Sequence, residues 1–303
     1  MKWRWRPNEC ELPLFDAAQF LELVRCKAMA FIGDSVGRNQ LESLMCLLAR
    51  VVHPVTQPSE GKAAKNWLYP DYNFTVTSIW STNLVKSSYV NHDGSSPKGL
   101  LNLYLDEADD AWTTQIEHFD YVIISAGQWF SRPLIYLEKG KVIGCHNCKS
   151  KNITKLSRFY GYRMALRTTF RTILTLQGFK GMAFVRTFSP THFGSEDWVR
   201  GKCSRKRPFR KEEMKFDPFV YEFYLTQVDE FEFIKREGME RGVRFILMDI
   251  TEAMGLRPDG HPYHYGQPPN QKQLIADCLH WCLPGPIDSW NEFLLHMLKT
   301  EGK

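Results

Sequence analysis

The chain lacks several features that would point to whole classes of protein. No apolar run reaches the roughly 18 residues that a membrane-spanning helix needs, so no stretch of the 303 residues is predicted to cross a bilayer. The N-terminal residues Met1 to Pro7 are aromatic and basic, without the apolar segment of a signal peptide. Internal repeats, low-complexity tracts and nucleic-acid modules are also missing, which excludes the repeat architectures and gives no support to nucleic-acid binding.

What is present is typical of a folded globular protein. Hydrophobic residues make up 43% of the chain and aromatic residues 14%, and the length suits one large α/β domain or two small ones. The net charge of +5 is mild. Its densest basic stretch, Lys202 to Lys211, could contact a phosphate or an acidic glycan, but a solvated loop is the favoured interpretation.

Cysteines and sequons favour an oxidising compartment. Two glycosylation sequons begin at Asn73 and Asn152, and several of the eight cysteines stand beside Gly, Pro or Trp in loop-like sequence. We therefore expect that the chain begins inside its domain and that a targeting segment is missing.

The cysteine spacing predicts two disulfides. Cys145 and Cys148 are expected to form a tight local bridge, and Cys203 to pair with Cys282 or Cys278. The alternative is a zinc site built from the same CxxC and CxxxC segments, which the loose spacing disfavours. No partner is evident for three others: Cys10, Cys26 and Cys46.

Alternating strand and helix patterns predict a parallel sheet covered by helices on both faces. The predicted buried strands are 28–32, 74–80, 121–125, 182–187 and 245–249. The predicted helices are 38–52, 156–176, 222–236 and 289–298. The polar segments 53–72, 86–98 and 194–218 are predicted to be loops or small excursions and not linkers between domains.

Ser35 is the candidate nucleophile. It follows the first strand at the start of a helix, at the edge where α/β sheets gather their ligands. Gly33 permits the tight turn, and the helix N-terminus favours the oxyanion of a tetrahedral intermediate. The simpler alternative is that Asp34 or Ser35 only caps the helix.

Asp277 and His280 are the candidates that would activate Ser35. At this spacing both side chains can share one face of a helical turn, where the carboxylate would fix the imidazole tautomer. The serine and this pair come from opposite ends of the chain and both stand near predicted strand ends. Their combination predicts acyl transfer through a serine ester.

Further polar residues follow the other strands. Gly127 could bring a backbone N–H to the same edge and Gln128 a side-chain amide, either of them as an oxyanion donor, although Gly127 could simply form a turn. His192 could bind substrate or support the site structurally. Trp80, Trp129 and Trp198 could stack on sugar rings, or simply belong to the core or rim.

Blocks spread over nearly the whole chain resemble the plant trichome birefringence-like family of polysaccharide O-acetyltransferases, which are PC-esterase proteins. The matching blocks are 3–10 (WRWRPNEC), 31–40 (FIGDSVGRNQ), 186–193 (RTFSPTHF), 256–262 (LRPDGHP) and 277–292 (DCLHWCLPGPIDSWNE).

The resemblance implies an SGNH/GDSL-like α/β fold with a smaller second lobe that forms a cleft. It implies that residues 1–303 are one acyltransferase domain whose N-terminal anchor and stem are missing. It also implies a Golgi membrane enzyme with a lumenal catalytic domain and no metal or resident cofactor. By the same resemblance, Arg38 and Asn39 are candidate substrate-binding residues.

The implied reaction is double displacement. Ser35 takes an acetyl group from a donor, for which acetyl-CoA is a candidate, with His280 as base and Asp277 as its orienter. A hemicellulose hydroxyl then accepts the acetyl group, and residues 73–75, 102–107 and 144–145 favour xyloglucan or mannan over xylan. The sequence departs from the family pattern in segment 193–198, which lacks a double glycine.

Two other functions fit the same residues. A polysaccharide acetyl esterase would use the same trio with water as acceptor, and the difference would rest on how well the closed site excludes water. A catalytically silent polysaccharide-binding protein would keep the fold but would not need the trio.

Overall fold

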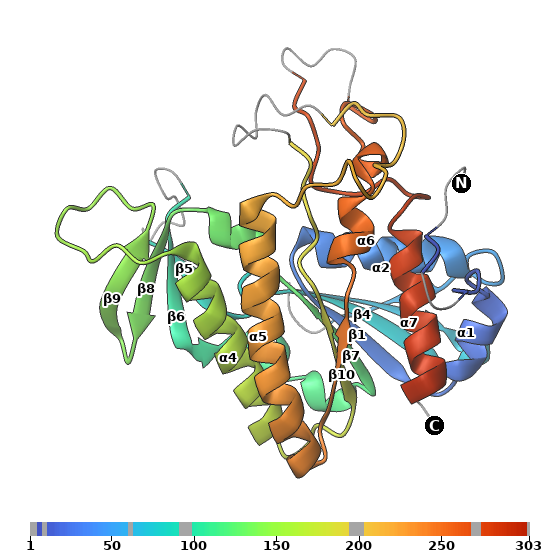
Figure 1. Cartoon of the computed structure of the whole chain (residues 1–303). Helices are drawn as coiled ribbons and strands as arrows, with labels where there is room; N and C mark the ends of the chain where they lie inside the picture. The colour runs from blue at the N-terminus through green and yellow to red at the C-terminus, as the bar shows by residue number, and fades with distance from the viewer. Residues whose placement is uncertain are drawn as a thin grey trace.

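A seven-stranded mixed sheet forms the centre of the computed structural model (Figure 1), which describes residues 5–7, 11–59, 63–90, 99–193, 203–267 and 274–301. From one edge to the other the strands are β11 (Arg244–Met248), β10 (Met182–Arg186), β7 (Tyr121–Ser125), β1 (Ala28–Gly33), β4 (Phe74–Trp80), β3 (Ala64–Tyr69) and β2 (Val55–Gln57).

The five predicted strands are confirmed as the parallel part of this sheet. β11, β10, β7, β1 and β4 pair in parallel with their neighbours. Their runs of apolar residues alternate between the two faces, so each strand is buried on both sides. The carboxyl ends of all five strands therefore meet at one edge.

The prediction of a purely parallel sheet is wrong at the other edge. β3 pairs antiparallel with β4, and β2 pairs antiparallel with β3. Both strands fall in segment 53–72, which the sequence predicts to be a loop. Their residues are only half-buried or exposed at most positions, so they lack the apolar run that marks a buried strand.

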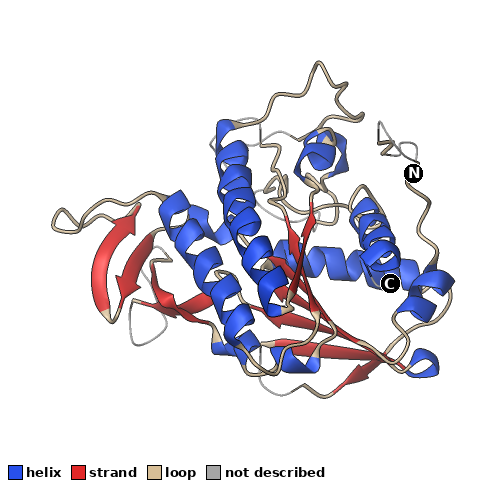
Figure 2. Cartoon of the chain, turned by 60° about the horizontal axis from the view of Figure 1, so that its bottom comes forward, coloured by secondary structure: helices blue, strands red, loops and turns tan. Residues whose placement is uncertain are grey.

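Helices cover both faces of the sheet (Figures 1 and 2). On one face lie α1 (Ala17–Leu23), α2 (Ser35–Leu48) and α7 (Asp288–Glu301), and on the other lie α4 (Arg158–Thr175) and α5 (Pro218–Arg241). Two separate apolar cores result, one between each helical layer and the sheet. The four predicted helices are α2, α4, α5 and α7, whereas α1 was not predicted.

Side-chain caps set where the helices begin. Asp34 accepts a hydrogen bond from the N–H of Val36, and Ser157 does the same for Tyr160 and Asp217 for Phe219. The α2 helix therefore starts at Ser35, three residues before its predicted start, because apolar spacing marks the packed turns rather than the cap.

A second, four-stranded sheet packs against α4. Its order is β5 (Val85–Tyr89), β6 (Leu101–Ala108), β8 (Leu134–Glu138) and β9 (Lys141–His146). Its buried residues, such as Leu103 and Tyr136, belong to the same core as the α4 side of the main sheet. The structure therefore does not confirm a separate smaller lobe with a cleft.

The remaining elements are short. They are α3 (Asp110–Thr113), α6 (Thr251–Gly255) and the 3₁₀ segments η1 (Pro70–Tyr72), η2 (Ile116–His118), η3 (Gln128–Ser131) and η4 (Pro258–Gly260). Within the described ranges, no helix combines the length and the apolar character needed to cross a bilayer.

Candidate active site

Ser35 stands at the junction between β1 and α2, as predicted. Gly33 ends the strand at φ 155°, and a Cβ there would lie 1.7 Å from the carbonyl oxygen of Ser125 in β7. Only glycine fits this turn, because both the backbone angle and the space exclude a side chain. Ser35 is half-buried at the first position of α2, with its hydroxyl at the carboxyl edge of the sheet.

The structure brings the three predicted catalytic residues together. The Nε2 atom of His280 lies 2.8 Å from the Oγ atom of Ser35, and its Nδ1 atom lies 3.0 Å from Oδ2 of Asp277. A carboxylate only accepts hydrogen bonds, so Nδ1 carries the proton and Nε2 offers a lone pair to the Ser35 hydroxyl. This geometry is that of a nucleophile, a general base and an orienting carboxylate.

Asp277 and His280 share a tight turn, not the predicted helical turn. Oδ1 of Asp277 accepts the backbone N–H groups of Leu279 and His280 at 3.1 and 3.0 Å. Burial would raise the pKa of Asp277. The hydrogen bonds from the side chain and backbone of His280 and from the backbone of Leu279 outweigh it and lower the pKa to about 2. Asp277 is therefore a carboxylate throughout the neutral range.

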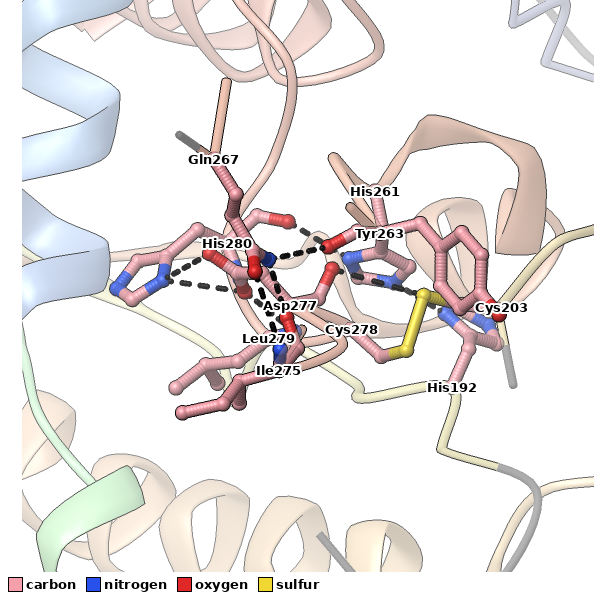
Figure 3. Close-up of a disulfide and its surroundings, with 10 residues drawn as sticks. All are labelled: His192, Cys203, His261, Tyr263, Gln267, Ile275, Asp277, Cys278, Leu279 and His280. Carbon is pink, nitrogen blue, oxygen red and sulfur yellow. Dashed lines mark hydrogen bonds and ion pairs between the residues drawn. A yellow bond between two sulfur atoms is a disulfide. The ribbon is translucent and has the colours of Figure 1, made fainter. Parts of the chain in front are cut away.

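A disulfide anchors the start of this turn. Cys278 bonds Cys203, which confirms one of the two predicted pairings (Figure 3). In the same view the ring of His280 points away from the disulfide. The bridge therefore restrains the backbone of the turn and leaves the imidazole in contact with Ser35.

Asn39 fixes the other end of the turn. Its Oδ1 accepts the N–H of Trp281 at 2.8 Å, and its Nδ2 donates to the carbonyl of Trp281 at 3.2 Å. The side chain is buried, with 6% of its surface exposed. Both polar groups of the Asn39 side chain are thus taken by the turn that carries His280, which argues against the predicted role of Asn39 in substrate binding. The sequence signal for a role of Asn39 near the site was its position four residues after Ser35, one turn along the same helix.

A pair of histidines supports the same turn. His261 contacts the carbonyl oxygen of His280 through Nδ1 at 2.7 Å, and its Nε2 lies 2.7 Å from Nδ1 of His192. The Nε2 atom of His192 lies 3.1 Å from the carbonyl oxygen of Gly255. Both ring nitrogens of His192 thus contact groups of the protein, which favours the structural role over the substrate-binding one. His261 was not predicted, because nothing in its spacing links it to residue 280.

The histidine pair is held neutral by its surroundings. Burial lowers the pKa of His192 to about 4, and burial followed by the charge of His192 lowers the pKa of His261 to about 3. Each of the three contacts, to His280, between the two rings and to Gly255, needs one N–H donor, but two neutral imidazoles carry only two ring N–H groups. With the protons on Nδ1 of His261 and Nδ1 of His192, the two contacts nearest His280 are hydrogen bonds, and Nε2 of His192 faces the carbonyl of Gly255 without a proton.

Comparison with known proteins places this arrangement in a family. The model of "PC-Esterase: GDSL/SGNH-like Acyl-Esterase family found in Pmr5 and Cas1p" matches residues 12–297. The chain belongs to this PC-esterase family.

Named relatives cover nearly all of the chain. Protein trichome birefringence-like 20 of Arabidopsis thaliana is 48% identical over 99% of this chain and 63% of its own length. Protein trichome birefringence-like 19 of the same plant is 47% identical, over 99% and 72%. Xyloglucan O-acetyltransferase 4 of Populus trichocarpa is 40% identical, over 99% and 71%. The chain thus spans less than two thirds of the first of these relatives.

Solved structures add nothing to this placement. An ADP-ribosylation-factor-like GTP-binding protein from Encephalitozoon cuniculi aligns over 94% of this chain and 86% of its own, with 10% identity and a TM-score of 0.36. A similarity at that level carries no information on function.

The predicted oxyanion donors of this PC-esterase differ in their surroundings. Gly127 has a φ of 150°, and a Cβ there would lie 2.7 Å from the ring of Phe188, so glycine is required. Gln128 is buried, and its Nε2 donates to the carbonyl of Ser189 at 2.8 Å. This bond ties the amide of Gln128 to the interior and argues against its predicted role. The backbone N–H of Gly127 stays the predicted donor.

A buried charge pair beneath Ser35 was not predicted. Asp34 and Arg186 are both buried, at 2% and 3% exposure. Burial raises the pKa of Asp34, while the charge of Arg186 and the N–H groups of Val36, Gly37 and Gln128 oppose that rise. Burial likewise lowers the pKa of Arg186 to about 10, against the charge of Asp34. The cap of α2 is thus electrostatically coupled to the end of β10.

Three of the four cysteines in the alternative zinc site form disulfides, and the fourth, Cys282, is a free thiol. Cys145 bonds Cys148, which confirms the second predicted disulfide, and Cys278 bonds Cys203. Cys26, Cys46 and Cys282 are free thiols. Within the described ranges, no group of three or more potential metal ligands occurs. Cys10 and Trp198 lie outside the described residues.

The basic stretch is partly paired. Arg205 and Arg207 both contact Glu213 at 2.8 Å. Arg207 and Arg210 line a cavity of about 900 Å³ whose walls include Phe209, Leu256 and Pro286, but none of the three catalytic candidates. The cavity is therefore not the candidate active site.

Proposed function

We propose that this PC-esterase domain is an O-acetyltransferase that carries an acetyl group on Ser35 and passes it to a hydroxyl of a hemicellulose. The contact of 2.8 Å between Ser35 and His280 is the observation that supports it most strongly. Relatives named xyloglucan O-acetyltransferase, from Populus trichocarpa and Arabidopsis thaliana, are 40% and 38% identical to the chain. Xyloglucan is therefore the favoured acceptor, with mannan next and xylan last.

The first half-reaction acetylates Ser35. Its Oγ attacks the carbonyl carbon of an acetyl donor while Nε2 of His280 takes the hydroxyl proton. The Asp277 carboxylate stabilises the imidazolium that forms. The backbone N–H of Gly127 and the N-terminus of α2 are the proposed donors to the developing oxyanion. The donor's leaving group then departs with the proton from His280, and an acetyl ester remains on Ser35.

The second half-reaction transfers the acetyl group. A sugar hydroxyl gives its proton to Nε2 of His280 and attacks the acetyl carbon. The tetrahedral intermediate collapses, the acetyl–Oγ bond breaks, and Ser35 regains its proton from His280. The donor is a co-substrate, and acetyl-CoA is the first candidate. No resident cofactor takes part in either step.

The description of the family as acyl-esterases keeps one alternative in view. An esterase would use the same residues and would pass the acetyl group to water. The two functions differ in the acceptor alone, so the products decide between them.

The test is product analysis with matched serine variants. The protein is incubated with an acetyl donor, either acetyl-CoA or 4-nitrophenyl acetate, and with oligosaccharides of xyloglucan, mannan or xylan. The masses of the products are then measured by mass spectrometry. Ser35→Ala should abolish acetylated sugar, whereas Ser88→Ala, an exposed serine in β5, serves as the control. Free acetate alone would support the esterase. Acetylated sugar from Ser35→Ala would refute the serine ester.

We also propose that the domain works in the Golgi lumen. Two disulfides support an oxidising compartment, and both sequon asparagines, Asn73 and Asn152, are exposed. Endoglycosidase treatment of the protein from plant cells should shift its mass, and Asn73→Gln with Asn152→Gln should remove the shift. A protein without glycans at both positions would argue against this location.

A further inference from the structure

Two tryptophans are in contact near the carboxyl end of β1, the strand that precedes Ser35. Trp80 is the last residue of β4 and pairs in register with Gly33 of β1. Trp129 lies in η3, just after β7, on the other side of β1. Their ring centroids are 5.9 Å apart with planes at 86°. Since neighbouring strands are about 5 Å apart, Trp80 starts within two residues and one strand spacing of Ser35.

Charged side chains extend this aromatic pair at both ends. Arg38, three residues after Ser35 and so on the same face of α2, has its Cζ 5.8 Å from the centroid of Trp80. Its Nε lies 3.5 Å from Glu42. At the other end, Cζ of Arg132 lies 3.5 Å from the centroid of Trp129. We call Arg38, Glu42, Trp80, Trp129 and Arg132 the aromatic strip.

The strip presents an open surface, although Trp129 also packs against the core on the α4 side of the main sheet. Trp80 is 39% exposed, and the side chains of Arg38 and Glu42 are 49% and 51% exposed. Trp129 is half-buried, and Arg132 covers one face of its ring. Trp129 therefore braces Trp80 at a right angle, and Trp80 carries the indole surface that remains available.

The chemistry of the strip suits a neutral sugar. An indole packs against the C–H face of a pyranose, arginine N–H groups donate to hydroxyl oxygens, and a carboxylate accepts from hydroxyl protons. A phosphate-rich donor such as acetyl-CoA fits less well. Glu42 offsets the charge of Arg38 and would repel phosphate at the end of the strip nearest Ser35.

We propose that the aromatic strip is the acceptor subsite, which holds a pyranose of a neutral polysaccharide beside Ser35. The proposal rests on the proposed transferase function and assigns the residues that recognise its acceptor. Trp80 stacks on the ring, and Arg38 and Glu42 bind the hydroxyls of the unit nearest the acetyl-serine. Arg132 acts through Trp129, whose ring it holds in place.

The test separates acceptor binding from acetyl chemistry. KM is measured for xyloglucan oligosaccharides and, separately, for acetyl-CoA, and the release of 4-nitrophenol from 4-nitrophenyl acetate reports on Ser35 alone. Trp80→Ala should raise KM for the oligosaccharide about tenfold, with a much smaller effect on KM for acetyl-CoA. Trp80→Phe should restore part of the affinity. Phe233→Ala, which removes an aromatic side chain that is 51% exposed on α5, is the matched control.

Each outcome has one meaning. A rise in KM for acetyl-CoA without one for the sugar would assign the strip to the donor and overturn the proposal. Equal KM values for Trp80→Ala and the unsubstituted protein would overturn it as well. Release of 4-nitrophenol that persists in Ser35→Ala would instead refute the proposed function. The two failures are thus distinguishable.

Discussion

The two sides of the Ser35–His280 contact are built on different principles. Ser35 is held by regular secondary structure, because β1 is hydrogen-bonded to β4 and β7 and the cap at Asp34 fixes the start of α2. His280 lies in a stretch from 278 to 287 without helix or strand. A disulfide, an imidazole and an amide hold that stretch at separate points. Regular structure therefore orients the proposed nucleophile, whereas individual contacts orient the proposed base.

This difference means that the contacts around His280 can be removed one at a time, whereas Ser35 cannot be moved without a change in the sheet itself. The base is also where two distant parts of the chain have to be joined, since Cys203 and Cys278 are 75 residues apart. Four experiments test the contrast, in order of decreasing effect.

Asp277→Asn should have the largest effect on turnover. The amide can still accept the N–H groups of Leu279 and His280, so the turn persists, but it no longer stabilises the imidazolium or enforces the tautomer. We expect kcat to fall about 10³- to 10⁴-fold with an unchanged unfolding midpoint. Steady-state kinetics and thermal unfolding measure the two. A fall of less than tenfold would contradict the role of Asp277.

Removing the disulfide that anchors the base should cost the most stability. With a separation of 75 residues, chain entropy predicts a loss of about 4 kcal/mol for Cys203→Ser with Cys278→Ser. The matched control is Cys145→Ser with Cys148→Ser. Its separation is 3 residues, and the expected loss is about 2 kcal/mol. Urea denaturation compares the pairs, and kcat should fall only in the first. Equal losses would remove the contrast.

Gly33→Ala tests the regular structure on the nucleophile side. The added Cβ would meet the carbonyl of Ser125, and we expect a loss of about 3 kcal/mol in the free energy of unfolding. Gly140 also has a positive φ, but nothing lies within 4 Å of the position of its Cβ. Gly140→Ala therefore measures the backbone strain alone, at about 1 kcal/mol. Urea denaturation that gives the same cost at both positions would show that the close approach has no effect.

As the pH falls, the histidine pair His192 and His261, which contacts the turn of His280, should lose its stabilising effect before Asp277 is protonated. An unfolded histidine titrates near pH 6.5, whereas His192 and His261 have folded pKa values of about 4 and 3. Between these limits the unfolded chain binds more protons, so stability is full above pH 6.5 and falls as the pH is lowered. The slope is at most about 1.4 kcal/mol per pH unit for each histidine.

Urea midpoints between pH 7 and pH 4.5 measure this slope, which His192→Phe should make shallower. His146, whose pKa burial lowers to about 4, adds to the slope in the same range and stays in both proteins. An equal slope in the variant would assign the acid sensitivity to other groups.

The parts of the fold that sequence predicts well are those with strong local signals. The five parallel strands are continuous apolar runs buried on both faces, and their ends came within two residues of the prediction. Strands β2, β3, β5, β6, β8 and β9 were missed. Most are half-buried, and their place is decided by pairing with distant strands, which local patterns do not reveal.

The site divides in the same way. Ser35, Asp277 and His280 could be found because each residue type and its spacing carry chemistry. The structural use of Asn39, Gln128 and His192 could not, since it depends on which backbone groups come to lie beside them. The partnership of His261 with the carbonyl of residue 280 is the clearest case, because only the tertiary fold joins them.

The paired bonds between Asn39 and Trp281 have a consequence for how His280 can move. Ser35 and Asn39 lie on successive turns of α2. The same helix therefore carries the hydroxyl of Ser35 and the amide that binds the backbone of Trp281, next to His280. The backbone next to His280 therefore cannot shift unless both bonds break. Any movement of the imidazole relative to Ser35 is confined to rotation of the His280 side chain.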